Sequence, residues 1–228
     1  MNINKLTTFL MFSSIAIIIL ISLGTWQLER LRWKTEIISS INNHISLPPI
    51  EINTSIINDI KNYNYRRIKL NGYYLYDKYI TIYSKVLNGK VGRHLIVPFK
   101  TQFGYIIINR GFIPEDYKVD PSLVKHSKEV SINGIIKFQQ KINYFTPKNN
   151  LINNEWYYVN LDEISTYFNI SLNDFYLIEE HNYKNKYPVG SQFYLNIPND
   201  HLQYAITWFS LAIALSIFMQ LLWRKNVR

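Results

Sequence analysis

Two uncharged apolar stretches, one near each end of the chain, constrain this sequence more than any other feature. The first runs from residue 6 to residue 28, and the second from residue 202 to residue 223. A helix needs roughly 20 apolar residues to cross a hydrocarbon core of about 30 Å, and each stretch is long enough. We therefore predict transmembrane helices at 6–28 and 202–223, with a domain of residues 29–201 between them.

The first stretch also has a second interpretation, as a cleaved signal peptide. Ser22-Leu23-Gly24 imitates a cleavage site that follows an apolar core. The core is, however, longer than the roughly 7 to 15 residues that are usual in signal peptides. This length favours a membrane anchor.

The basic residues that flank the two stretches indicate the orientation. Lys5 precedes the first stretch and three basic residues lie within 224–228, with no acidic residue at either tip. Basic residues gather on the cytoplasmic side, so we expect both termini in the cytoplasm and the central domain outside it. Three basic residues at 30–34 oppose this orientation, but long loops cross the membrane largely regardless of their charge.

The short segment before the first stretch bears on the compartment. Only five residues precede residue 6, which leaves no room for an amphipathic mitochondrial presequence. We therefore expect a multi-pass protein of a bacterial inner (plasma) membrane, with a periplasmic central domain and the lipid bilayer as a partner.

Charge and cysteine content exclude several classes of function. The net charge is +9, but four of the 25 basic residues lie at the tips, so the central region with all 16 acids is only +5. No dense basic run occurs there, which disfavours a nucleic-acid partner. The absence of cysteine excludes disulfides, thiolate zinc sites, iron–sulfur sites, covalent haem attachment and a cysteine-ligated copper site.

The central region has the pattern of strands separated by turns. Alternating, β-branched or aromatic runs predict strands at 65–76, 79–86, 94–99, 105–109, 130–138, 156–159 and 175–178. Asn88-Gly89 predicts a hairpin, residues 42–58 and 143–154 read as loops, and 160–168 has the capping residue and acidic first turn of a short helix. The predicted fold class is an α+β membrane protein with a β-rich, mostly antiparallel extracytoplasmic domain.

The strongest side-chain cluster lies at the start of the second stretch. His201, Tyr204, Ala205 and Trp208 are spaced i, i+3, i+4 and i+7, so they share one face of a helix. A histidine beside aromatic residues at a membrane boundary is placed to ligate haem. These residue types are also ordinary at a membrane interface, and the spacing by itself favours that second interpretation.

A matching cluster ends the first stretch. Trp26, Arg30 and Trp33 share a face at i, i+4 and i+7. If the two helices pack together, Trp26 and Arg30 approach the second cluster, and the arginine can pair with haem propionates. The alternative is a snorkelling arginine within an aromatic belt.

Motifs for catalysis are missing from the central region. There is no G-x-S-x-G or H-E-x-x-H motif, and the remaining histidines are scattered singly at 44, 94, 126 and 181. Arg110, which follows an apolar strand, either binds an acidic group of a partner or closes the strand by bonding to nearby carbonyls. We therefore expect a protein that is not an enzyme.

Five segments, in matching order and spacing, resemble the surfeit locus protein 1 family of cytochrome c oxidase assembly factors. They are LGTWQLERLRWK (23–34), GRHLIVPF (92–99), IIINRGFIP (106–114), EWYYVNLDEIS (155–165) and NDHLQYAITWFSLA (199–212). The resemblance covers nearly the whole chain, and its two membrane-boundary motifs are the specific ones. Phe112 and Ile113 depart from the tryptophan and valine that are usual in the family.

The resemblance implies that the protein binds haem a and aids its insertion into the catalytic subunit of cytochrome c oxidase, with a haem a synthase as a second candidate partner. It places the iron ligand at His201, and Trp26 and Trp208 also match family positions. Arg30 and Gln27 match less closely. We include Tyr204, one helical turn from His201, in the candidate haem site.

Two alternatives to the haem chaperone remain. The first is a haem-free membrane scaffold that stabilises an oxidase assembly intermediate through the surface around Arg110 and Tyr117. The second is an enzyme that acts on haem or lipid, which the missing catalytic motifs disfavour.

Overall fold

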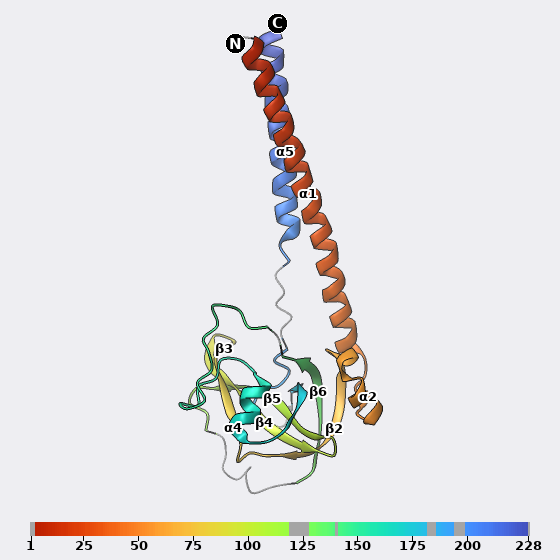
Figure 1. Ribbon diagram of the computed structural model, residues 1–228, viewed down its shortest axis with the longest axis vertical. Coiled ribbons are helices and arrows are strands. Elements are labelled where there is room, and N and C mark those ends of the chain that lie inside the picture. Colours follow the sequence, from red (N-terminus) through yellow and green to blue (C-terminus); the bar gives the residue numbers. More distant parts are fainter. Residues whose placement is uncertain (1–2, 119–127, 140, 182–185, 194–198, 228) are drawn as a thin grey trace. The chain divides into compact units, whose positions relative to one another are not determined.

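The computed structural model describes residues 3–118, 128–139, 141–181, 186–193 and 199–227 (Figure 1). The chain divides into two compact units. One consists of residues 1–41 with 195–228, and the other of residues 42–194.

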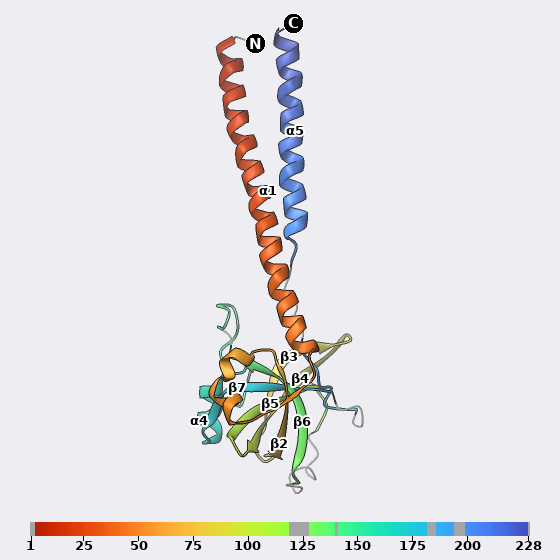
Figure 2. The same ribbon diagram turned by 90° about the vertical axis from the view of Figure 1, so that its right-hand side faces the viewer.

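The first unit contains a pair of long helices, most of α1 (Ile3–Ser46) and all of α5 (His201–Val227), while the last five residues of α1 belong to the second unit. They lie side by side and antiparallel, so that the first and last described residues lie at the same end of the pair (Figures 1 and 2). Both are long and apolar enough to cross a membrane. The two apolar helices at the ends of the chain are confirmed.

Helix α1 is longer than the uncharged stretch from which it was predicted. It continues past residue 28, so residues 29–46, which the sequence assigned to the domain, extend the helix. It ends at Ser46, ahead of Leu47, because Pro48 and Pro49 lack the backbone N–H group and disfavour helical conformation in the residue before them. The predicted loop at 42–58 is therefore wrong, since this segment completes α1 and forms β1 and α2.

Small side chains lie where the two helices contact each other. Ala205 and Ala212 of α5 are buried, as is Ser13 of α1. A Cβ atom built on Gly24 would lie 2.7 Å from the ring of Phe209, so glycine at this position lets that ring approach the α1 backbone. Small residues are common at the contacts between helices that associate in lipid.

The second unit is a seven-stranded sheet with short helices. Its elements are β1 (Ile50–Glu51), α2 (Thr54–Asn58), η1 (Ile60–Tyr63), β2 (Arg67–Tyr74), β3 (Ile80–Leu87), β4 (Lys90–Thr101), β5 (Gly104–Pro114), β6 (Val130–Phe138), α4 (Leu161–Phe168) and β7 (Leu172–Glu179). The strand order is β1-β2-β6-β7-β5-β4-β3. The β-rich, mostly antiparallel domain is thus confirmed, with β1–β2 and β5–β7 as its parallel pairs.

The sheet closes on itself because β2 has two antiparallel neighbours. Its first part pairs with β6, and Tyr73 and Tyr74 at its end pair with Lys100 and Phe99 of β4. Strands β2, β6, β7, β5 and β4 therefore form a barrel-like ring, which Figure 2 shows as a strongly curved sheet.

The side chains of the ring alternate between two apolar clusters. Ile106 and Ile108 of β5 point into the interior with Phe99 and Leu177, while Ile107 packs on the outer cluster. This alternation is the two-residue period of a strand, and here both faces are buried. The outer cluster includes Trp156 and the buried side of α4.

Helix α4 confirms the short helix expected at 160–168. The side-chain oxygen of Asn160 accepts hydrogen bonds from the backbone N–H groups of Asp162 (3.1 Å) and Glu163 (3.2 Å). Ile164 and Phe168 are buried, and Asn169 ends the helix in the left-handed conformation with φ of 53°.

The strand predicted at 156–159 is wrong. Trp156 makes a single isolated bridge with Ile82, and its fully buried indole ring fills the outer cluster. Its Nε1–H group donates to the side-chain oxygen of Asn154 over 2.8 Å. The aromatic pattern of this segment reflects packing beneath α4 and not strand pairing.

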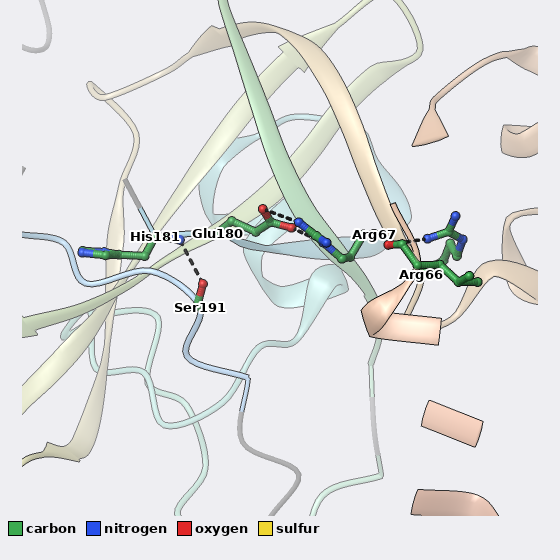
Figure 3. A network of polar contacts seen from close by, with 6 residues as sticks. Arg66, Arg67, Glu180, His181 and Ser191 are labelled. Carbon is green, nitrogen blue, oxygen red and sulfur yellow. Dashed lines mark hydrogen bonds and ion pairs between the residues drawn. The ribbon is translucent and has the colours of Figure 1, made fainter. Parts of the chain in front are cut away.

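Polar contacts hold the start of β2 to the segment after β7 (Figure 3). The guanidinium group of Arg67 donates to both carboxylate oxygens of Glu180, with 3.0 Å between Nη2 and Oε2. The backbone N–H of His181 donates to Ser191 Oγ over 2.9 Å. Arg66 donates to the carbonyl of Leu47 (3.2 Å), the first residue after α1.

Candidate functional site

His201 is the first residue of α5, and its imidazole is oriented by a residue of α1. Its Nδ1 atom lies 2.7 Å from the side-chain oxygen Oε1 of Gln27, and the ring is partly buried. An amide oxygen can only accept a hydrogen bond, so Nδ1–H must be the donor. In the neutral ring Nε2 then carries the lone pair, which makes it the nitrogen that is free to ligate a metal.

Two aromatic residues accompany His201 on α5, and we call them the α5 pair: Tyr204 and Trp208. Tyr204 is 56% exposed and Trp208 is partly buried, whereas Ala205 faces α1. From the helical repeat, Tyr204 and Trp208 are rotated about 60° and 20° counter-clockwise from His201, viewed from the N-terminal end of the helix.

Three exposed residues lie beside Gln27 on α1, and we call them the α1 cluster: Trp26, Arg30 and Trp33. The guanidinium carbon of Arg30 lies 5.8 Å from the ring centroid of Trp26 and 5.0 Å from that of Trp33. These are cation–π distances, so the two indoles hold the cation between them. The cluster is rotated about 60° to 120° counter-clockwise from Gln27, in the same sense as the α5 pair.

The α1 cluster and the α5 pair therefore lie on the same side of the two helices. Gln27 and His201 face each other, and in antiparallel helices the same sense of rotation turns side chains to one side. Further along the pair, a groove of about 620 Å³ is lined mostly by apolar residues of both helices such as Ile17, Ile21 and Ile213. Near His201, one side of the pair is thus aromatic and cationic.

The donor set fits a metal that brings its own ligands. Among the residues that the structure describes, no group of three or more His, Cys, Asp or Glu side chains is placed to hold a bare ion. A single neutral imidazole suits an iron macrocycle, which supplies four equatorial nitrogens and needs only an axial ligand. The flanking rings and the Arg30 cation suit a flat apolar group with acidic edges.

The other described histidines have structural partners in the second unit. The side-chain amide of Asn109 donates to His94 Nδ1 over 3.2 Å, and burial, with a smaller contribution from the Lys85 cation, lowers the pKa of His94 to about 4. His44 Nδ1 lies 3.3 Å from the carbonyl of Asn64. His126 lies outside the described residues.

Arg110 lies inside the barrel and not on a surface that a partner can reach. Its Nε–H donates to Glu179 over 2.8 Å, its Nη1 donates to the Tyr76 hydroxyl, and each member of the ion pair is 10% exposed. Burial alone would lower the pKa of Arg110, but the neighbouring Tyr74, Glu179 and Tyr76 raise it, so the guanidinium group stays charged. The predicted bonding to nearby carbonyls is not what the structure shows, because the described acceptors of Arg110 are the side chains of Glu179 and Tyr76.

The contact between Gln27 and His201 is a feature that the sequence did not reveal. The sequence offers Gln27 only as a less close match to the family motif, and glutamine has no distinctive chemistry by itself. The available signal was its spacing from Gly24 and Leu31, which places it on the face of α1 that meets α5.

Comparisons with known proteins agree with the segments that carried the resemblance. The model of the SURF1 family matches residues 14–213. A SURF1-like protein of Rickettsia felis is 34% identical over 92% of this chain and 93% of its own length. The surfeit locus protein 1 of Mus musculus is 29% identical over 85% of this chain and 69% of its own length. The matched range includes both Gln27 and His201.

Proposed function

Because this chain belongs to the SURF1 family, we propose that it is an assembly factor for cytochrome c oxidase that binds haem a and aids its insertion into the catalytic subunit. The family resemblance supports the oxidase as client. The observation that carries the haem site is the 2.7 Å contact between Gln27 Oε1 and His201 Nδ1, which leaves Nε2 as the ligating atom.

Each side chain of the site has a distinct part in this proposal. His201 binds the iron through Nε2, and Trp26 and Trp208 pack beside the ring. Arg30, held between two indoles, offers its N–H donors to the propionates, and Tyr204 adds a hydroxyl on the same side of the pair. The haem supplies the iron and four of its ligands.

A chaperone must also release what it binds. One protein imidazole leaves the second axial position open, so a histidine of the acceptor subunit can take over the haem. The exposure of the α1 cluster on one side of the helices gives that acceptor access. In this proposal the protein is not an enzyme, and a haem a synthase is the candidate donor.

The proposed location is a bacterial inner membrane, with α1 and α5 spanning it. Because α1 and α5 are antiparallel, the start of α1 and the end of α5 lie on the same side of the membrane in this proposal. The last turn of α5 carries Arg224 and Lys225. The positive-inside rule makes that side the cytoplasm, so residues 29–201 project into the periplasm.

The proposal is tested by the haem content of the purified protein. The chain is produced together with a haem a synthase, purified in detergent and compared with His201→Ala by absorption spectroscopy. We expect the wild type to carry haem a and His201→Ala to lose most of it. His44→Ala, which removes a histidine of the second unit, is the matched control and should keep its haem. Equal haem in wild type and His201→Ala would contradict the proposal.

A haem-free scaffold is the second candidate function, and one surface favours it. Tyr144, Phe145 and Ile152 are 94%, 86% and 96% exposed, which is unusual for large apolar side chains and typical of docking surfaces. Because Arg110 is mostly buried, the candidate contact surface under this alternative is formed by these three residues and not by the surroundings of Arg110. Under this alternative, His201→Ala leaves the haem occupancy of the oxidase unchanged in the same cells.

A further inference from the structure

We infer that Gln27 is a positioning residue for the haem ligand: by accepting the Nδ1 proton of His201 it holds the imidazole in the one tautomer that presents Nε2 to iron. This inference rests on the proposed function, since it specifies how that site is prepared. Gln27 does not touch the haem in this arrangement, and acts only through His201.

The hydrogen-bond chemistry of the pair supports this assignment. A free neutral imidazole exchanges its proton between two nitrogens, and only the form with the proton on Nδ1 offers Nε2 as a ligand. The acceptor Oε1 selects that form and also fixes the ring plane. Metal-ligating histidines are generally oriented by such a partner on the other nitrogen, and the partner raises the basicity of the ligand.

The positions of the two residues add a second argument. Gln27 belongs to α1 and His201 to α5, so the ligand is oriented only when the two helices are packed. A second hydrogen bond joins α1 to the segment just ahead of α5, from the side-chain amide of Asn199 to Thr35 Oγ1 over 3.3 Å. This bond ties the approach to α5 onto α1 without touching His201, so its removal is a control for a loosened contact near the site.

The test compares three variants of the full-length protein after production with a haem a synthase. Gln27→Leu removes the acceptor, and Gln27→Glu replaces it with a stronger one. Thr35→Val removes the hydrogen bond from Asn199 to α1 and leaves His201 untouched. The measurements are haem affinity and the reduction midpoint potential of the bound haem, with His201→Ala as the reference without a ligand.

Gln27→Leu should bind haem about 10- to 100-fold more weakly, the usual cost of losing the partner of a metal ligand. Gln27→Glu should retain haem and lower the midpoint potential, because a carboxylate makes the imidazole more basic and stabilises ferric iron. Thr35→Val should match the wild type in both measurements. If Gln27→Leu does not fold, the reduction midpoint potential of haem bound to Gln27→Glu decides whether Gln27 positions His201.

The outcomes separate this inference from the proposed function. Haem loss in His201→Ala, with unchanged affinity in Gln27→Leu and unchanged midpoint in Gln27→Glu, overturns the positioning role and leaves the haem site standing. A haem content in His201→Ala equal to that of the wild type overturns both. A parallel loss in Thr35→Val and Gln27→Leu, with no midpoint shift in Gln27→Glu, attributes the effect to helix packing and overturns the inference.

Discussion

Arg110 and Glu179 show how the surroundings of a charged residue determine what its ion pair contributes to stability. Both side chains are only 10% exposed, and the guanidinium group of Arg110 lies over the rings of Tyr74 and Tyr76. Glu180, the next residue, lies on the other face at the end of the strand and forms an ion pair with Arg67. The side chains of Arg67 and Glu180 are 29% and 25% exposed, respectively. Two neighbouring glutamates therefore form ion pairs of very different burial.

This difference predicts the cost of breaking each pair. Arg110→Leu should destabilise the domain by about 3 to 5 kcal/mol, because Glu179 would remain buried without a cation. Arg67→Leu should cost about 1 kcal/mol or less, since water can still reach Glu180. Urea unfolding in detergent, followed by tryptophan fluorescence, measures both, because buried Trp156 is the tryptophan of residues 42–194.

The double variant Arg110→Leu/Glu179→Leu is the internal control, since it removes both charges together. It should recover much of the stability that Arg110→Leu loses. Equal losses in Arg110→Leu and Arg67→Leu would show that burial does not govern these pairs.

At the scale of elements, the irregular part of β5 depends on one glycine. Gly111 has φ of 104°, in the region that L side chains rarely adopt, and the register between β4 and β5 shifts at this point. The backbone of Val189 runs against it, and Phe112 and Val189 exchange two backbone hydrogen bonds of 2.8 and 2.9 Å. A Cβ atom on Gly111 would lie 1.9 Å from the carbonyl oxygen of Val189.

Replacement of this glycine should therefore be costly for two separable reasons. Gly111→Ala combines backbone strain of roughly 1 to 3 kcal/mol with displacement of Val189. Gly89→Ala is the matched control, because Gly89 also has a positive φ, of 76°, but has no atom within 4 Å of a built Cβ. We expect a clearly lower urea midpoint for Gly111→Ala than for Gly89→Ala. Equal midpoints would mean that the close approach of Val189 does not matter.

At the scale of the whole molecule, the antiparallel helices and the charges at their ends predict the membrane topology. The chain contains no cysteine, so a single introduced cysteine is the only site that a maleimide can label. Tyr144 in the second unit is 94% exposed, and Lys225 near the end of α5 is exposed. These two positions report on opposite sides of the membrane in the proposed orientation.

Labelling should separate them. In spheroplasts, a membrane-impermeant maleimide should modify Tyr144→Cys, while Lys225→Cys should react only after the membrane is broken. The cysteine-free parent protein is the blank for both. Modification of Lys225→Cys in intact spheroplasts would show that the orientation is the reverse of the proposed one, with the second unit in the cytoplasm.

Local pattern was enough for several features of this protein. An uncharged stretch of sufficient length is a helix in lipid wherever it occurs, because every backbone group must be bonded within the segment. Asn160 with Asp162 and Glu163 predicts a capped helix from neighbouring residues alone. The runs that became β2 to β7 were also recognisable, although their ends shifted and 156–159 was mistaken for a strand.

The sequence by itself thus determined two apolar helices, a β-rich domain and the candidate residues His201, Trp26, Trp208, Arg30 and Tyr204. Only the tertiary structure decided that β2 closes the ring with β4, that Arg110 points inward, and that Gln27 holds His201. The physical reason is distance along the chain: Gln27 and His201 are 174 residues apart, and Arg110 and Glu179 are 69 apart. No local periodicity encodes such pairs, because they form only when separate elements pack against each other.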